Sequence, residues 1–433
     1  MADSDRTIRI EVPILARVEG EGALDLVIHG EQIDSLSLRI YEPPRFFEKF
    51  LEGRSVTEVP EMVARICGIC PVAYQMSAVQ ALEGLFGVEV TPWVRDMRRL
   101  FYCGEWIQSH SLHIHLLAAP DFLGYESAIA MAGEYGDEVR RGLRLQGLGN
   151  RIIALLGGRS VHPVGARIGG FHHAPPSDEA ESLLVEVREG VVDAEELLRW
   201  LVMLDLPDYE QEFTSVALRS GDRYPMMEGK IVSDHGLEIP ISDFESHFTE
   251  SQVPHSTAFH SHLDGKPYLV GPLARINLNF DQLPPAVIAL CGELGIHFPS
   301  RNMFHSLIAR AVELLVTLHE AADLLSSYQL PERPWSDFTP REGVAFGATC
   351  APRGILWHRY QVDGSGKVLS ATIVPPTSQN QARIEEDLRS SLESFGLERD
   401  EEEIKLYGEK VIRNYDPCIS CATHFLSLKV ERR

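Results

Sequence analysis

The sequence predicts an α+β fold that is predominantly helical, with a buried bundle of long helices and small antiparallel β elements. Apolar residues alternate with polar ones near the start of the chain, and they recur at helical spacing over most of the remainder. Of the 433 residues, 44% are hydrophobic, which is enough for a large core. No internal repeat or low-complexity segment is evident, so we treat residues 1–433 as a single domain.

The first predicted element is a small antiparallel β-meander over residues 7–42. Three runs of alternating apolar residues predict its strands, and the glycines between them supply the turns. The alternating residues are Ile8, Ile10 and Val12, then Leu24, Leu26 and Ile28, then Leu36, Leu38 and Ile40.

Residues 45–343 are predicted to be mainly helical. Pro71 suits the first position of a helix that runs to about Leu85, because the missing amide hydrogen costs nothing there. The long apolar segment 93–119 contains no proline, and its single Gly104 is tolerable inside a buried helix. Helical periodicity also covers residues 137–156, 178–203 and 301–327.

Residues 344–374 are predicted to contain a β-hairpin, because "GILWHRYQV" and "KVLSATIV" flank the turn sequence "DGSG". The "GSGK" in this turn is not a phosphate-binding loop, since its upstream glycine is missing and Val368 replaces the serine or threonine that would hold magnesium. Residues 378–424 are predicted to form C-terminal helices, over 378–395 and about 400–413, that lead to a cysteine motif.

The charge of the chain argues against nucleic acid as a partner. The net charge is −23, from 40 Lys and Arg against 63 Asp and Glu, whereas nucleic-acid binding relies on basic side chains that neutralise phosphates. No run of about 18 apolar residues predicts a membrane span. The first ten residues are polar and lack the apolar core of a secretory signal, so we expect a cytoplasmic protein.

Two CxxC pairs are the strongest indication of function in the sequence. Cys67 and Cys70 lie in "ARICGICPVA", and Cys418 and Cys421 lie in "YDPCISCATHF". Two cysteines at this spacing can direct both sulfur atoms at one metal, so two pairs can form a four-thiolate site. Seven cysteines without an export signal favour reduced thiols or metal ligands over a disulfide scaffold.

Two other interpretations of these pairs stay open at this stage. A structural zinc site is the commonest role of paired CxxC motifs, although its ligands usually lie within a few tens of residues and hold together a small domain. A thioredoxin-like redox pair needs only one CxxC, placed at a strand-to-helix turn. Elemental analysis distinguishes zinc from nickel and iron.

The motifs "RICGIC" and "DPCISCATH" resemble the two metal-binding signatures of the large, catalytic subunit of [NiFe] hydrogenases. The resemblance runs nearly end to end, and "APRG" and "PPTSQN" are similar to the soluble cytoplasmic, NAD(P)-linked branch that includes the sulfhydrogenases. It implies a [NiFe]-hydrogenase large-subunit fold and reversible heterolytic cleavage of H2 to protons and electrons. The quinone-site subunit of respiratory complex I is a rival with a similar fold, but it lacks the cysteine pairs.

The resemblance also implies the metal ligands. Cys67 and Cys418 would be terminal thiolates on nickel. Cys70 and Cys421 would bridge nickel to an iron that carries CO and cyanide ligands. Heterolytic cleavage needs a Lewis acid for the hydride and a base for the proton, and a metal-bound thiolate can be that base.

Two acidic residues match further positions of the family. Glu19, in "ARVEGEG", aligns with the glutamate that exchanges protons with a terminal cysteine, a role that a pKa raised by burial would suit. Glu48, in "RFFEKFLEGR", aligns with a ligand of a buried magnesium or similar hard cation, and His424 would complete that site. From its residues alone, Glu19 could instead be a solvated turn residue.

Several polar residues align with groups that surround the metals in the family. Asp121, which follows "HIHLLAAP", aligns with a group that lies over the open face of the metals in the family, as do Pro352 and Arg353 in "CAPRG" and Asp416 before the second pair. Thr377 takes the position whose hydroxyl bonds a cyanide. A guanidinium stays protonated and can donate to an anionic ligand, which suits Arg353. The simpler alternatives are a helix cap for Asp121 and a surface ion pair for Arg353.

One position departs from the family pattern. Tyr74 stands where many members carry histidine, and its hydroxyl could donate to a sulfur without being cationic. The remaining histidines and cysteines have simpler interpretations. We predict packing or hydrogen-bonding roles for His110, His113, His115, His172 and His173, and small buried apolar roles for Cys103, Cys291 and Cys350.

The resemblance extends to maturation and to partners. We hypothesise that residues 425–433, "FLSLKVERR", are a C-terminal peptide that a maturation endopeptidase removes after His424; a frayed polar terminus is the alternative. The three cysteines outside the two pairs are too few for an iron–sulfur cluster, and no GxGxxG follows a strand. We therefore expect an obligate iron–sulfur small subunit, diaphorase subunits with FAD and NAD(P), and H2 and protons as substrates.

Overall fold

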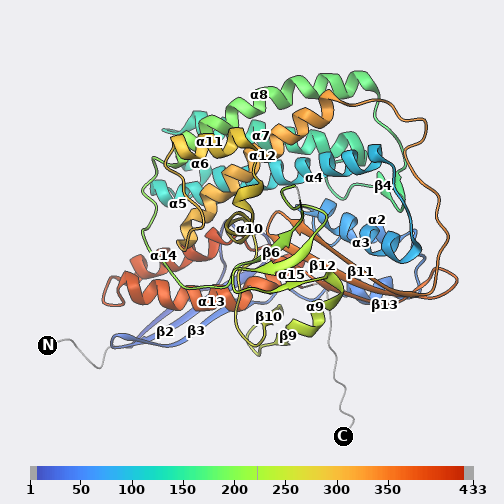
Figure 1. Cartoon of the computed structure of the whole chain (residues 1–433). Helices are drawn as coiled ribbons and strands as arrows, with labels where there is room; N and C mark the ends of the chain where they lie inside the picture. Colours follow the sequence, from blue (N-terminus) through green and yellow to red (C-terminus); the bar gives the residue numbers. More distant parts are fainter. Residues whose placement is uncertain (1–6, 222, 424–433) are drawn as a thin grey trace, which may run out of the picture.

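The computed structural model describes residues 7–221 and 223–423. The chain forms a mainly helical body in which long helices lie above small antiparallel sheets (Figure 1). About 48% of it is helical. This architecture agrees with the predicted fold class.

The N-terminal meander forms a three-stranded antiparallel sheet at the edge of the body. Its strands are β1 (Thr7–Val12), β2 (Gly22–His29) and β3 (Gln32–Ile40), in the order β1-β2-β3. The alternating apolar residues face inward, so that one face of the sheet packs on two C-terminal helices, α13 (Pro376–Phe395) and α14 (Glu401–Asn414). The three strands lie where the alternation predicted them.

Four long helices form the bundle: α4 (Pro92–Leu112), α7 (Gly136–Gly157), α8 (Ser177–Leu201) and α12 (Ser306–Ser326). Two glycines explain how closely α4 and α7 approach. A β-carbon on Gly149 would lie 2.4 Å from the amide nitrogen of Gln108, and one on Gly104 would lie 2.9 Å from Ile152. Helices α4 and α7 can therefore approach this closely only with glycine at both positions. The sequence predicted that the helix could accommodate Gly104, and the structure shows that the packing needs it.

The segment predicted as one helix over residues 93–119 is interrupted. Helix α4 ends at Leu112 and continues as the π-helix η1 (His113–Ala118), which leads into α5 (Ala119–Leu123). Pro120 lacks an amide hydrogen, so the α-helical bond to the carbonyl four residues earlier cannot form there. The widened turn lies beside the C-terminal helix α14, which is in contact with η1.

The predicted hairpin is present but belongs to a larger sheet. Strands β12 (Gly354–Val362) and β13 (Val368–Val374) pair as expected, and β11 (Gly343–Ala351) adds a third strand. Strand β11 was not predicted, because "GVAFGATCA" is rich in glycine and alanine and shows little polar alternation. Helix α3 (Pro71–Phe86) packs across β11 and β12.

The other elements are short. They are α1 (Phe47–Leu51), α2 (Val59–Val63), α6 (Ala128–Met131), β4 (Ala166–Arg167), β5 (Gly170–Phe171), β6 (Val216–Arg219), β7 (Lys230–Ser233), β8 (Glu238–Ile239), η2 (Ile241–Asp243), α9 (Phe244–His247), β9 (Phe248–Gln252), β10 (Phe259–Leu263), α10 (Pro272–Asn279), η3 (Phe280–Gln282), α11 (Pro285–Glu293), η4 (Met303–His305) and α15 (Ile419–Ala422). Within residues 7–221 and 223–423, no helix has the length and apolar character that crossing a membrane requires.

Candidate metal centre

The two CxxC pairs meet in the interior. The Sγ atoms of Cys67 and Cys418 lie 3.3 Å apart, those of Cys70 and Cys421 lie 3.3 Å apart, and those of Cys418 and Cys421 lie 3.0 Å apart. All four sulfur atoms lie within 4.8 Å of one another. Each side chain is at most 3% exposed. The expected convergence of thiols from opposite ends of the chain is therefore present.

The first pair is fixed by the start of helix α3. Cys70 is the residue before the helix, and Pro71 occupies its first position as predicted. The buried carboxyl of Glu105 on α4 accepts the amide hydrogens of Val72 and Ala73, at 2.6 and 3.1 Å. These amides begin the helix and have no partner within it, so Glu105 holds the end of α3 beside Cys70.

The second pair is fixed by the N-terminal segment. The backbone carbonyl of Glu19 accepts the amide hydrogen of Ile419 at 2.9 Å, and the Glu19 carboxyl accepts that of Ser420 at 3.0 Å. Gly20 has a φ of 91°, and a β-carbon there would lie 2.6 Å from Ile419. Glycine at position 20 thus allows the two segments to lie side by side.

Arg45 connects the two pairs directly. Its guanidinium donates to the carbonyl of Ile66 at 2.6 Å and also to the carbonyl of Ser420. One carbonyl precedes Cys67 and the other lies between Cys418 and Cys421. Sequence reasoning missed this residue, because no spacing links position 45 to either motif.

The ionisation of the four thiols is coupled. Hydrogen bonds from Cys418, and then from Cys421 and Cys70, hold the pKa of Cys67 well below its usual value. Contacts with Cys421 and Cys67 raise the pKa of Cys418 well above its usual value. One thiolate in so small a volume opposes ionisation of its neighbours. The four can be thiolates together only beside positive charge, so this buried, soft donor set fits a metal centre.

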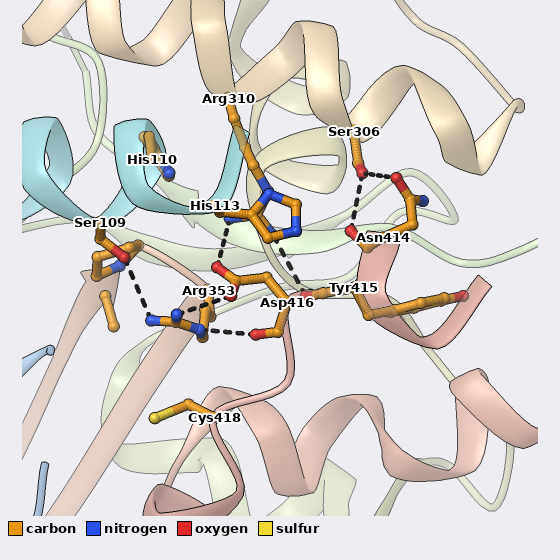
Figure 2. A network of polar contacts seen from close by, with 12 residues as sticks. Ser109, His110, His113, Ser306, Arg310, Arg353, Asn414, Tyr415, Asp416 and Cys418 are labelled. Carbon is orange, nitrogen blue, oxygen red and sulfur yellow. Dashed lines mark hydrogen bonds and ion pairs between the residues drawn. The ribbon is translucent and has the colours of Figure 1, made fainter. Parts of the chain in front are cut away.

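Two buried arginines meet a buried aspartate beside the second pair (Figure 2). Arg353 donates to the carboxylate of Asp416 at 2.8 Å and to its carbonyl at 2.7 Å, and Arg310 lies 3.1 Å from the other carboxylate oxygen. Arg353 also donates to the Ser109 hydroxyl at 3.3 Å. Asp416 has a left-handed backbone, with a φ of 56°, and these bonds hold it in that conformation.

Charges in this network are fixed. Burial raises the pKa of Asp416, but Arg353, His113 and Arg310 outweigh it, and the net pKa lies below the usual value. Burial lowers the pKa of Arg353, yet Asp416 and the sulfur atoms of Cys418, Cys70 and Cys67 bring it well above the usual value. The guanidinium of Arg353 therefore stays protonated next to the thiols.

Comparison with known proteins agrees with this geometry. The sequence profile described as nickel-dependent hydrogenase matches residues 45–139 and 259–424. The chain belongs to the nickel-dependent hydrogenase family. It is thus a hydrogenase catalytic subunit, an oxidoreductase that acts on H2, as the two signatures predicted.

Relatives of this hydrogenase subunit match along its whole length. Sulfhydrogenase 1 subunit alpha of Pyrococcus furiosus is 33% identical over 97% of this chain and 98% of that protein. Sulfhydrogenase 2 subunit alpha of the same organism is 32% identical over 97% of this chain and 100% of that protein. A crystal structure of an NAD+-reducing [NiFe]-hydrogenase in the H2-reduced state has a TM-score of 0.89 and 27% identity, covering 96% of this chain and 99% of that one.

Glu19 is in direct contact with the second cysteine pair. The Sγ of Cys418 donates to its carboxyl at 3.1 Å. Burial, and then the charge of Cys67, raise the pKa of Glu19 above its usual value. The alternative that Glu19 is a solvated turn residue is therefore wrong in this hydrogenase subunit, because its carboxyl is partly buried and bonded to a cysteine.

Thr377 and Pro352 also lie in the surroundings of the centre. The Thr377 hydroxyl accepts the amide hydrogen of Cys418 at 3.0 Å, which leaves its own hydrogen available to donate. Pro352 is buried, and its carbonyl accepts a hydrogen bond from Arg275 at 3.0 Å. The surface ion pair considered for Arg353 is wrong, since its partner is the buried Asp416.

Asp121 is tied to a different part of the site. Its carboxylate binds Arg413 through two bonds of 2.7 and 2.9 Å and also binds Arg17. The carbonyl of Arg413 lies 2.8 Å from a ring nitrogen of His113, a buried imidazole near Asp416. Asp121 is thus connected to the network through Arg413, and these ion pairs do more than cap a helix.

Tyr74 is completely buried beside the thiols. Burial, and then the nearby Cys421 and Cys70, raise the pKa of Tyr74 well above its usual value. The phenol therefore keeps its hydrogen and can act as a neutral donor toward sulfur. Tyr74 therefore brings no charge to the thiols.

Glu48 lies apart, at the start of helix α1, and His424 lies outside the described residues. The Glu48 carboxyl accepts the amide hydrogen of Ile373 at 2.7 Å. Burial raises the pKa of Glu48 to about 7 despite this bond and the charge of Arg359. A carboxylate oxygen is the kind of ligand that a hard divalent cation prefers.

The other histidines and cysteines largely follow their predictions. His110 lies 2.9 Å from Glu313, and His113 and His115 are buried and hydrogen-bonded to backbone carbonyls, as expected. His172 and His173 are both exposed, so a packing role is wrong for them, and their hydrogen-bonding role stays a prediction. The predicted burial of Cys103, Cys291 and Cys350 is confirmed.

Proposed function

We propose that this subunit acts in a cytoplasmic [NiFe] hydrogenase that passes electrons from H2 through an iron–sulfur small subunit toward NAD(P). The observation that carries the proposal is the buried group of four thiols with Glu19 bonded to Cys418. The sulfhydrogenase relatives and the NAD+-reducing neighbour support the electron acceptor.

The four cysteines are proposed to hold the nickel–iron centre. Cys67 and Cys418 would be ligands of nickel, and Cys70 and Cys421 would be shared with an iron that carries CO and cyanide ligands. When bound, this centre supplies a Lewis acid for the hydride of H2. The protonated Arg353 and the free hydrogen of Thr377 are the donors that would hold the diatomic ligands in place.

The proton is proposed to leave through Cys418 and Glu19. The two groups lie 3.1 Å apart, and the raised pKa of Glu19 makes its carboxyl a better match for exchange near neutral pH. The next polar groups toward the surface are Ser420 and Glu42, whose hydroxyl and carboxyl oxygens are 3.3 Å apart. Asp416 takes no part in this transfer, because its ion pairs keep it ionised.

The remaining proposals concern the second cation and the partners. Glu48 and His424 are proposed to hold magnesium or a similar cation, and an endopeptidase is proposed to remove residues 425–433 after metal insertion. An obligate iron–sulfur subunit and diaphorase subunits with FAD would complete the enzyme. The subunit names of the relatives support such an assembly.

The test uses the complex co-purified from cells that assemble it. We expect nickel and iron in near-equal amounts, infrared bands of CO and cyanide, and H2-dependent reduction of NAD(P). Cys418→Ser should abolish H2 turnover, whereas Cys291→Ser, at another buried cysteine, should leave it near wild type. Zinc in place of nickel and iron, or full activity of Cys418→Ser, would contradict the proposal.

A further inference from the structure

A second group of potential metal ligands lies outside the cysteine centre. One ring nitrogen each from His255 and His260 and a carboxylate oxygen of Glu385 lie within 4.8 Å of one another. His255 comes from the loop after β9, His260 from β10, and Glu385 from helix α13. The two histidines belong to one hairpin and Glu385 to a helix more than 100 residues further along the chain, so a shared ion would join the hairpin to the helix.

We propose that His255, His260 and Glu385 bind a zinc ion that fastens the β9–β10 hairpin to helix α13. Two imidazole nitrogens and one carboxylate oxygen, with water in the fourth position, are a donor set that zinc takes in proteins. The set is chemically distinct from the four thiols, which are softer ligands.

The distances are suitable for closure on an ion. Nε2 of His255 lies 2.8 Å from one oxygen of Glu385, and Nδ1 of His260 lies 3.9 Å from the other. The imidazole rings are 5.7 Å apart and inclined at 82°, so they approach the carboxylate from two directions. Ligands about 2.0–2.1 Å from zinc lie roughly 3.3 Å apart, so small side-chain rotations would complete the site.

His260 gives an independent reason to expect a ligand. Its side chain is 4% exposed, and its Nε2 has no hydrogen-bond partner within residues 7–221 and 223–423, whereas Nδ1 faces Glu385 at 3.9 Å. A buried polar group without a partner is costly, and native structures leave few of them. An ion bound through Nδ1 would give this buried ring a strong partner and would leave the ring proton on Nε2.

Glu385 is already oriented for this task. The oxygen that faces His255 also accepts the amide hydrogen of Leu38 in β3, at 2.8 Å. Backbone bonds of this kind commonly orient metal-binding carboxylates. The side chains of His255 and Glu385 are 29% and 19% exposed, so water can reach the fourth position and chelators can reach the ion.

The ion would support the catalytic region without belonging to it. Helix α13 begins next to Thr377, whose hydroxyl accepts the amide hydrogen of Cys418, and β10 packs on the same helix. Joining the hairpin to α13 should therefore stabilise the fold around that helix. The inference is independent of the reaction proposed above.

The experiment measures zinc in the co-purified complex after loading with zinc and removal of the free ion. Wild type should retain one zinc per chain at this site, and Glu385→Gln and His255→Ala should each weaken binding at least tenfold. His235→Ala is the matched control, because His235 also contacts a carboxylate, Asp234 at 2.9 Å, but has no second imidazole. His255 is partly exposed, so its variant does not disturb the core.

Zinc X-ray absorption identifies the site that holds the ion. Nitrogen and oxygen scattering with imidazole features supports the inference. Sulfur scattering alone would place the zinc on the cysteines and overturn it. Equal zinc retention by wild type, Glu385→Gln and His255→Ala would overturn it as well.

Discussion

The surroundings of the four thiols differ sharply between two groups of residues. Arg353, Asp416 and Arg310 form the fixed side, where every charge is buried and paired within 3.1 Å. Glu19 forms the titrating side, where a partly buried carboxyl touches Cys418 and has a raised pKa. Both groups lie next to the second cysteine pair. The first group must keep its charges, whereas the second must gain and lose a proton.

This difference separates two tasks that one residue cannot perform together. A group that stabilises negative charge must keep its own charge throughout, which the ion pairs of Arg353 ensure. A group that carries a proton must lose and regain it near the working pH, which requires a pKa shifted toward neutrality. Arg353 keeps its charge because it is buried against Asp416. Glu19 can gain and lose a proton because it is only partly buried next to Cys418.

The largest expected effect is on the titrating side. Glu19→Gln removes the proton acceptor but keeps the shape, so exchange of D2 with water should fall about 10²- to 10⁴-fold. Wild-type exchange should also decline as the pH falls through the raised pKa of Glu19, since only the ionised carboxylate accepts a proton, and the variant should lack this decline. Mass spectrometry of the released isotopes measures both.

Glu21→Gln is the matched control for that variant, because Glu21 is exposed and lies two residues along the same segment. Metal content should remain at the wild-type value in both variants, since neither removes a thiol. Exchange at the wild-type rate in Glu19→Gln would assign the proton to another route.

The next effect concerns the fixed side. Arg353→Lys keeps the charge but loses the planar donor that binds both the carboxylate and the carbonyl of Asp416, so H2 turnover should fall about 10- to 100-fold. Its pH profile should keep the wild-type shape, because Glu19 is intact. Steady-state H2 oxidation with an artificial acceptor measures the loss.

The comparison for this variant is Arg359→Lys, a partly exposed arginine of β12 that pairs with Glu245. We expect its activity to stay within about twofold of wild type, as for other surface ion pairs. A shifted pH profile in Arg353→Lys would contradict this prediction, because it would show that Arg353 influences the titration of Glu19.

Short-range patterns in the sequence predicted much of this site. The CxxC spacing indicated the ligands of each pair, and alternation and helical periodicity located the meander and the long helices. Family resemblance added Glu19 and Thr377, whose neighbours here include Cys418. The metal-ligand roles themselves remain proposals, as does the site of Glu48 and His424.

Contacts between distant segments were beyond the sequence. Arg45 reaches Ser420 across 375 positions, and Arg310 meets Asp416 across 106, so no local pattern announces either. Strand β11 was missed because pairing with β12, and not its own composition, makes it a strand. In the same way, His255 and Glu385 become neighbours only through the fold.

The smallest expected effect is at Tyr74, and it tests whether this residue belongs to the titrating side. Tyr74→Phe removes a neutral donor from beside Cys421 and Cys70 without changing any charge. Removing a neutral hydroxyl from beside sulfur costs about 1 kcal/mol, so turnover should fall less than about tenfold with no change in pH profile. Tyr328→Phe, whose hydroxyl donates to the carbonyl of Pro175 at 2.5 Å, is the control and should match wild type. A loss as large as that of Glu19→Gln would show that Tyr74 also moves protons, and the titrating side would then extend across both cysteine pairs.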